Sequence, residues 1–126
     1  MKSLMSYFYL AQARMGIMDL DNVLEIEARD GHTSRVKALL EAGADVHADN
    51  DEALRTAAWW GRTSTVKTLL ENGADVHAKN DGALKWAKEM KRGDTIRVLD
   101  DWMSKRGNIV VIPNQPTTKA DQRRPQ

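Results

Sequence analysis

Apolar residues in the middle of the chain recur with the spacing of amphipathic helices. The apolar positions are Ala53, Leu54, Ala57 and Ala58 before Gly61, and Val66, Leu69 and Leu70 after it. At 3.6 residues per turn each set lies on one face, which predicts two short helices. Gly61 and Gly73 are expected to end them, because glycine tolerates the left-handed conformation at a helix C-terminus. Asp51 is expected to cap the first helix, and Thr63 or Ser64 the second.

This predicted pair of helices belongs to an internal repeat. Residues 31–50 align with residues 61–80 at a shift of 30, with five mismatches in twenty positions. A weaker copy follows, in which Asp81, Ala83, Leu84 and Ala87 stand 30 places after Asp51, Ala53, Leu54 and Ala57. The units span residues 21–50, 51–80 and 81–106. Such a period is typical of stacked supersecondary units, because one short helix pair buries too little apolar surface to be stable alone.

The shared pattern of the units, AL..AA..G....V..LLE.GADV.A, is similar to the ankyrin repeat over roughly residues 21–104. The resemblance implies an all-α solenoid of stacked helix-turn-helix pairs, with a concave binding face lined by the ends of the first helices and by the finger tips. The period here is 30, where the family usually has 33. The missing residues fall before Leu54 and Leu84, so we expect short finger loops.

The first twenty residues are predicted to cover the open end of the array. They fall outside the repeat register, because Arg14 and Met15 stand where Ala44 and Asp45 stand thirty residues later. Terminal units of such arrays are atypical, which favours a capping helix from about Lys2 to Met15. Two alternatives stay open: a secretory signal, and a flexible leader ahead of a later start codon.

One charged residue interrupts the apolar face of the first unit. Glu27 stands where the middle unit has Ala57. A carboxylate cannot be buried against a closely packed neighbour without a partner. We therefore expect either a partly covered face or pairing with Arg14 or another base.

The last twenty residues, 107–126, are predicted to form a flexible tail. They contain all three prolines together with polar and basic residues. Their apolar run, residues 108–112, is expected either to fold back on the last helix or to act as a docking peptide. Trp102, just before the tail, is expected to pack at this end of the array.

The composition argues against a catalytic or metal site. The chain has no cysteine and a formal net charge of +1, so disulfides and thiolate chemistry are excluded and there is no strong bias toward nucleic acid. His47 and His77 recur once per unit, but helices in neighbouring units lie about 8–10 Å apart, too far for two ligands of one zinc ion. We expect these to be turn histidines bonded to the backbone. Asp45 and Asp75 are expected to accept hydrogen bonds from the backbone of their own turns. The sequence also lacks a phosphate loop and a nucleophile elbow, so we expect no enzyme activity, cofactor or small-molecule substrate.

The end of the first helix in each unit is the predicted binding surface. In the middle unit Ala57 and Ala58 take the inward positions, so at least one of Trp59 and Trp60 must face water. Exposed tryptophan is enriched in binding hot spots. The alternative is that both tryptophans pack over neighbouring helices.

By the same resemblance, the finger tips complete the binding surface. Arg55 and Lys85 are expected to add a basic stripe on the exposed side of the first helices, and charges of this kind set the orientation of a partner. The predicted partner-binding residues are Trp59, Trp60, Arg55, Asp49, Glu52, Lys79, Lys85, Glu89 and Met90.

These features predict a non-catalytic protein–protein interaction module that acts as an inhibitor or adaptor. The short repeats look similar to those of viral and bacterial chains in which host-directed binding is common, which implies a cytoplasmic location in a host or bacterial cell. The alternative is attachment to a membrane surface or nucleic acid through the aromatic leader or the basic tail around Lys119, Arg123 and Arg124. Three dispersed cations supply little affinity for either. We expect a monomer, with self-association through the open ends of the stack as a further alternative.

Overall fold

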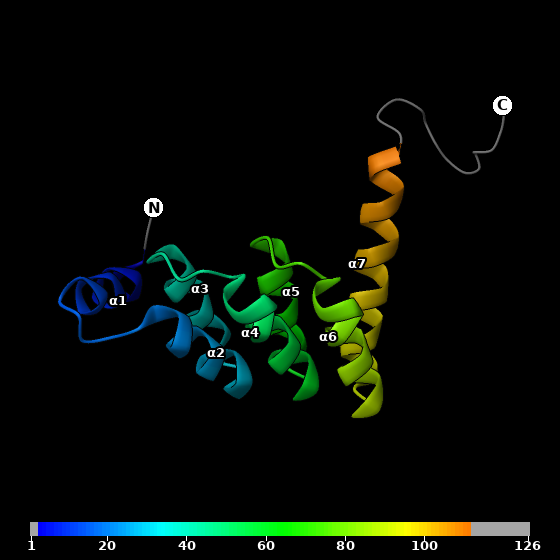
Figure 1. Ribbon diagram of the computed structural model, residues 1–126, viewed down its shortest axis with the longest axis horizontal. Coiled ribbons are helices and arrows are strands. Elements are labelled where there is room, and N and C mark those ends of the chain that lie inside the picture. The colour runs from blue at the N-terminus through cyan, green and yellow to red at the C-terminus, as the bar shows by residue number, and fades with distance from the viewer. Residues whose placement is uncertain (1–2, 112–126) are drawn as a thin grey trace, which may run out of the picture.

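The computed structural model describes residues 3–111, with side chains for residues 3–105. This part of the chain forms seven α-helices and no strand (Figure 1). The helices are α1 (Leu4–Arg14), α2 (Leu20–Asp30), α3 (Thr33–Glu41), α4 (Ala48–Trp59), α5 (Thr63–Glu71), α6 (Ala78–Glu89) and α7 (Gly93–Val111). The predicted all-α architecture is confirmed.

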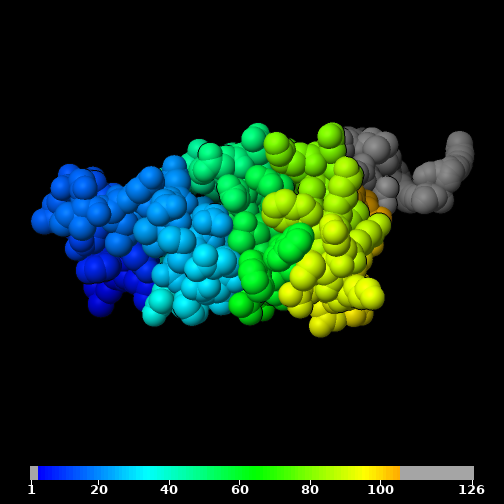
Figure 2. Space-filling view, turned by 60° about the horizontal axis from the view of Figure 1, so that its bottom comes forward, coloured from blue at the N-terminus to red at the C-terminus, as the bar shows by residue number. Residues whose placement is uncertain are grey.

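The helices stack in two rows. Helices α2, α4 and α6 form an inner row, and α1, α3, α5 and α7 form an outer row, with α2/α3, α4/α5 and α6/α7 as the pairs of successive units. The array therefore extends in chain order, which Figure 2 shows as successive bands of colour along the molecule. The stacked helix-turn-helix solenoid is the arrangement that the repeat predicts.

Alanines at the inward positions allow the inner helices to approach closely. Ala28, Ala57, Ala58 and Ala87 are fully buried, and so are the leucines that fill the space between pairs, such as Leu54. The glycine after α4, Gly61, has the predicted positive φ of 70°. The spacing of small and large apolar residues in the sequence therefore agrees with the close helix packing in the structure.

Helix α1 belongs to the outer row and keeps the repeat register. Its buried Tyr9 stands one period before Leu39, Leu69 and Leu99, which are fully buried at the same position of α3, α5 and α7. The predicted helix is confirmed, but placing it outside the register was wrong for its buried positions. The mismatch at Arg14 arises because α1 ends three residues later in the register than α3 does.

Each finger is reduced to a single left-handed turn. Residues 49–51 and 79–81 all have φ between 55° and 61°, a conformation that Asp and Asn tolerate better than most residues. Asp51 is therefore not the helix cap that we predicted. Its buried carboxylate accepts a hydrogen bond from the N–H of Asp75 at 2.7 Å, which ties the start of the unit to its last turn. Asp21 does the same for Asp45 at 2.7 Å.

Threonine pairs and arginine side chains join successive units. The hydroxyls of Thr63 and Thr95 lie 2.8 Å apart in the outer row. The prediction that Thr63 or Ser64 caps α5 was wrong, because Arg62 holds the cap position and makes no side-chain cap bond. Arg62 Nε instead donates to the carbonyl of Arg29 at the end of α2. Arg92 Nε donates in the same way to the carbonyl of Trp59.

The last helix is longer than its counterparts. Because α7 continues to Val111, the prediction that the chain leaves the helix at Gly107 was wrong for residues 107–111. Trp102 is half-buried and packs against the core, as expected. The remaining tail, residues 112–126 with Lys119, Arg123 and Arg124, lies outside the described residues. No helix within the described residues is long and apolar enough to cross a membrane.

Candidate functional site

The tryptophans at the end of α4 lie on the inner row. Trp60 is 44% exposed, so the prediction that at least one of the pair faces water is confirmed. Trp59 is half-buried, and its ring meets that of Trp86 on α6 edge to face, with centroids 5.4 Å apart and planes at 80°. This geometry is a favoured one for aromatic pairs. The alternative that the tryptophans pack on neighbouring helices is therefore met by Trp59 only.

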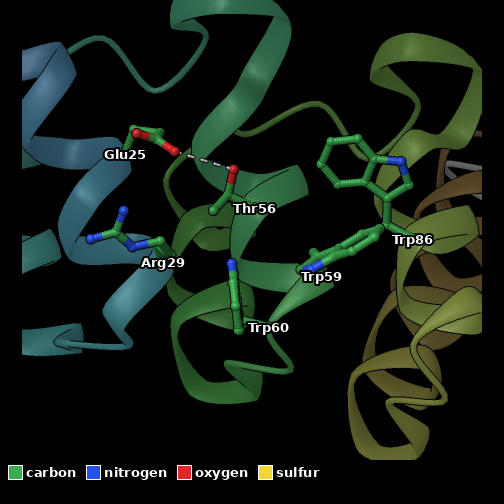
Figure 3. A pocket seen from close by; sticks show the side chains of 6 residues that line it. All are labelled: Glu25, Arg29, Thr56, Trp59, Trp60 and Trp86. Carbon is green, nitrogen blue, oxygen red and sulfur yellow. Dashed lines mark hydrogen bonds between the residues drawn. The ribbon is translucent and has the colours of Figure 1, made fainter.

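A pocket of about 370 Å³ opens between the three inner helices (Figure 3). Helix α2 supplies Glu25 and Arg29, α4 supplies Thr56, Trp59 and Trp60, and α6 supplies Trp86. Three indole rings thus form one side of the pocket, and a carboxylate and a guanidinium stand on the other. Its size lies in the range of sites that hold a side chain or a small ligand.

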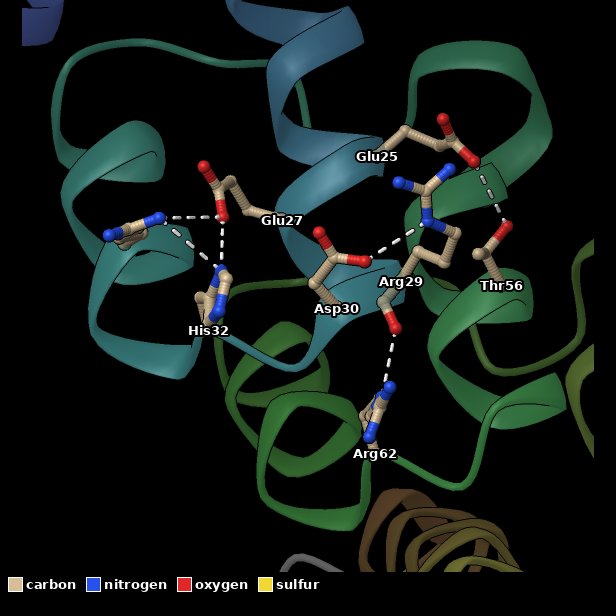
Figure 4. A network of polar contacts seen from close by, with 8 residues as sticks. Glu25, Glu27, Arg29, Asp30, His32, Thr56 and Arg62 are labelled. Carbon is tan, nitrogen blue, oxygen red and sulfur yellow. Dashed lines mark hydrogen bonds and ion pairs between the residues drawn. The ribbon is translucent and has the colours of Figure 1, made fainter.

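Polar contacts hold the α2 side of the pocket in place (Figure 4). The hydroxyl of Thr56 donates to Glu25 Oε2 at 3.5 Å, and Arg29 Nε pairs with Asp30 at 3.2 Å. The Arg29 carbonyl accepts the bond from Arg62 at 2.8 Å. Both charged side chains on this side therefore have a polar partner next to the pocket.

A comparison with protein families decides what kind of array carries this pocket. The family model for ankyrin repeats, in three copies, matches residues 2–80, which is more than half of the chain. The chain belongs to the ankyrin repeat family. The match begins ahead of α1 and ends within α6, so the ankyrin register includes the terminal helix. No curated protein gives a match. Ankyrin repeats are generally protein–protein interaction modules and are typically not enzymes.

Arg55 does not belong to an exposed basic stripe of the ankyrin array. It is only 8% exposed, and it donates to the carbonyls of Asn50 at 3.1 Å and Asp49 at 2.9 Å. Its guanidinium also lies 5.2 Å from the ring centroid of Trp86. It can bend this way because Gly82 leaves room: a Cβ there would lie 3.0 Å from the Arg55 Cδ. Arg55 is therefore buried against Trp86, one of the rings that line the pocket, and is not on the exposed side of the helix as we had expected.

The other predicted residues do not line the pocket. Asp49 and Lys79 are exposed on the left-handed turns, while Lys85 and Glu89 are exposed on α6. Glu52 and Met90 are half-buried. Of the nine predicted residues, only Trp59 and Trp60 line the pocket.

Sequence reasoning missed four of the six lining residues. Trp86 follows Trp59 by 27 residues, which is one helical turn less than the repeat period. Stacked inner helices bring such positions together, so this spacing was an available signal. Arg29 occupies the Trp59 position of the first unit. Glu25 and Thr56 carried no separate signal.

Outside the pocket, histidine and aspartate side chains form hydrogen bonds within the turns between helices. His47 Nδ1 lies 3.1 Å from the carboxylate of Asp51, and this bond is the main reason why the pKa of His47 is raised above its usual value. The ring thus bonds a carboxylate, where we had expected backbone. Asp45 accepts from the N–H of His47 at 2.9 Å, as predicted. The described residues contain no group of three or more side chains suited to hold a metal ion.

Glu27 has the partner that its position demands. Its carboxylate lies 2.6 Å from His32 Nδ1 and 3.5 Å from Arg35, as Figure 4 shows for His32. The predicted pairing with a base is therefore confirmed, with His32 and Arg35 in this role and not Arg14. This pairing stands away from the pocket and accounts for a charged residue at an otherwise apolar position.

Proposed function

We propose that this ankyrin array binds a partner protein through the pocket between α2, α4 and α6, without catalysis. The observation that carries the proposal is the group of three indoles, contributed by two neighbouring helices, around an open pocket. Tryptophan side chains in desolvated pockets dominate the binding energy of many interfaces. Trp60 keeps nearly half of its surface in water, so burying it against a partner removes a large apolar area from solvent.

An apolar side chain of the partner would pack in this pocket against the exposed ring of Trp60. Glu25 and Arg29, on the opposite side of the pocket, offer an acceptor and a donor for the polar groups next to that side chain. Thr56 and Asp30 already contact these two residues at the edge of the pocket. The exposed Lys85 contributes to orientation and to the exclusion of wrong partners.

Occupying a partner's surface is the mode of action that fits such a module. In this proposal the array works as an inhibitor or adaptor in the cytoplasm, and its similarity to short ankyrin repeats of viral and bacterial chains favours a host-directed partner. Asp49 and Lys79, on the exposed left-handed turns, lie outside the pocket and would contact only a partner larger than a short peptide.

The test is affinity capture with a matched pair of variants. Trp60→Ala removes the most exposed indole, and Lys67→Ala removes an exposed side chain from α5 in the outer row. Circular dichroism first shows that both variants are as helical as the wild type. We expect a protein that wild type and Lys67→Ala retain and that Trp60→Ala loses. The same set of captured proteins for all three would refute binding through the pocket.

A further inference from the structure

Exposed apolar side chains are concentrated at one end of the array. The described residues include seven large apolar side chains that are exposed, and six of them lie between Leu4 and Ile17. The seventh is Trp60 in the pocket. The end formed by α1 therefore differs from the rest of the surface and has no part in the pocket.

Helix α1 is apolar on two opposite sides. One side, with Ser6 and Tyr9, is buried against α3. The opposite side carries Leu4, which is 88% exposed, and Phe8, which is 55% exposed. A surface helix normally has its apolar residues on the side that faces the core and polar residues on the opposite side. The side facing away from α3 thus has the character of an interface.

The exposed side has the spacing of a helix-packing seam. Leu4, Phe8, Ala11 and Met15 are separated by four, three and four residues, the a/d spacing of a coiled coil, and all four are exposed. Tyr7 borders the seam and is exposed as well. This spacing matches another helix better than an extended peptide, whose side chains alternate with a period of two.

The size and charge of the surface suit a second copy of the chain. The half-exposed aromatics and the more exposed aliphatic side chains offer roughly 500 Å² of apolar area per copy, close to the apolar share of a standard interface of about 800 Å² per partner. Arg14 is the only charged side chain among residues 3–18, so two such surfaces meet with little repulsion. A patch of this kind is self-complementary under a two-fold axis.

We propose that the protein forms a two-fold dimer in which the exposed seam of α1, Leu4-Phe8-Ala11-Met15, packs against the same seam of a second copy. The dimer replaces the monomer that we expected from the sequence. No residue of α1 lines the pocket, so both pockets stay accessible. Some partners display two copies of the bound motif. Two linked pockets would bind such a partner more tightly than one pocket does, because the second contact is intramolecular.

The proposal is tested by analytical ultracentrifugation over a wide concentration range. We expect the wild type to pass from 14.2 kDa to twice that mass as concentration rises. Phe8→Glu places a charge in the seam and is expected to raise the dimer dissociation constant by roughly tenfold or more, the effect of burying an unpaired charge. Leu4→Lys, at a side chain that is almost wholly in water, is a second disruption that leaves the core untouched. Trp60→Glu is the control and is expected to dimerise like the wild type.

Several results would overturn the dimer. These are a wild type that stays monomeric at all concentrations, dimerisation unchanged in both Phe8→Glu and Leu4→Lys, and assembly beyond a dimer. Cosedimentation with phosphatidylcholine and phosphatidylserine vesicles gives one more outcome. A monomeric wild type that binds vesicles, and a Phe8→Glu variant that does not, would assign the seam to a lipid surface.

Discussion

Arg55 offers the sharpest test of how the array holds its pocket. In Arg55→Ala the carbonyls of Asn50 and Asp49 lose their donor, and Trp86 loses the guanidinium beside its ring. Both carbonyls lie on an exposed turn where water takes the place of the donor, so each hydrogen bond is worth about 1 kcal/mol. The cation–π contact adds about 0.5–1 kcal/mol. We therefore expect the free energy of unfolding to fall by about 2–3 kcal/mol.

The chain supplies its own control for this measurement. Lys85 occupies the position of Arg55 in the next unit and is exposed. We expect Lys85→Ala to change the free energy of unfolding by no more than about 0.5 kcal/mol. Urea titration followed by circular dichroism measures both variants, and Arg55→Lys should fall between them because it keeps the charge and loses the planar fork. Equal losses for Arg55→Ala and Lys85→Ala would refute the supporting role of Arg55.

Three further predictions concern the turns. Asp51→Ala should lower the free energy of unfolding by about 1–2 kcal/mol in urea titration, because the buried carboxylate of Asp51 accepts a hydrogen bond from a backbone N–H. Asp81→Ala should lower it by less than half as much, because the carboxylate of Asp81 is exposed. Similar losses for the two variants would contradict this explanation. Asp51 raises the pKa of His47 in the folded state, so this pair stabilises the fold fully below the unfolded-state pKa and ceases to do so as pH rises through the folded-state pKa. NMR titration of the imidazole should give a lower pKa in Asp51→Ala than in the wild type. An unchanged pKa would contradict Asp51 as the cause of the shift. Gly61→Ala should destabilise the fold more than Gly73→Ala does. Both glycines have positive φ, but only at Gly61 would a Cβ lie 2.7 Å from an arginine side chain of the next unit. Thermal unfolding compares the two variants, and the reverse order of stability would exclude that clash as the cause.

The features that could be predicted from the sequence are those that depend on the residues of a single unit or on the repeat period. The helix pairs, the glycine at residue 61 and the close approach at Ala57 follow from local spacing, and all are confirmed. The exposed side of Trp60 followed from the same helical geometry. Each of these needs only 3.6 residues per turn and the repeat itself.

The parts that escaped prediction depend on contacts between units at unequal positions. Arg55 is buried because Gly82, thirty residues after Glu52, has no side chain, so the direction of one residue is decided by a gap in the next unit. Trp86 reaches Trp59 across a shift of 27 and not 30. Aligning units by their period compares equivalent positions and does not reveal such diagonal neighbours. The two left-handed turns were missed for a different reason: losing three residues from a finger was interpreted only as a shorter loop.

The bond from Arg92 to the carbonyl of Trp59 links the angle between successive units to the shape of the proposed binding pocket. Because the pocket draws its walls from three units, any bend of one unit against the next changes the angle between its walls. The arginine resists that bend at the residue where the wall begins. A partner that fills the pocket would in turn hold the three units at one fixed angle, so that binding at a single site stiffens the whole array.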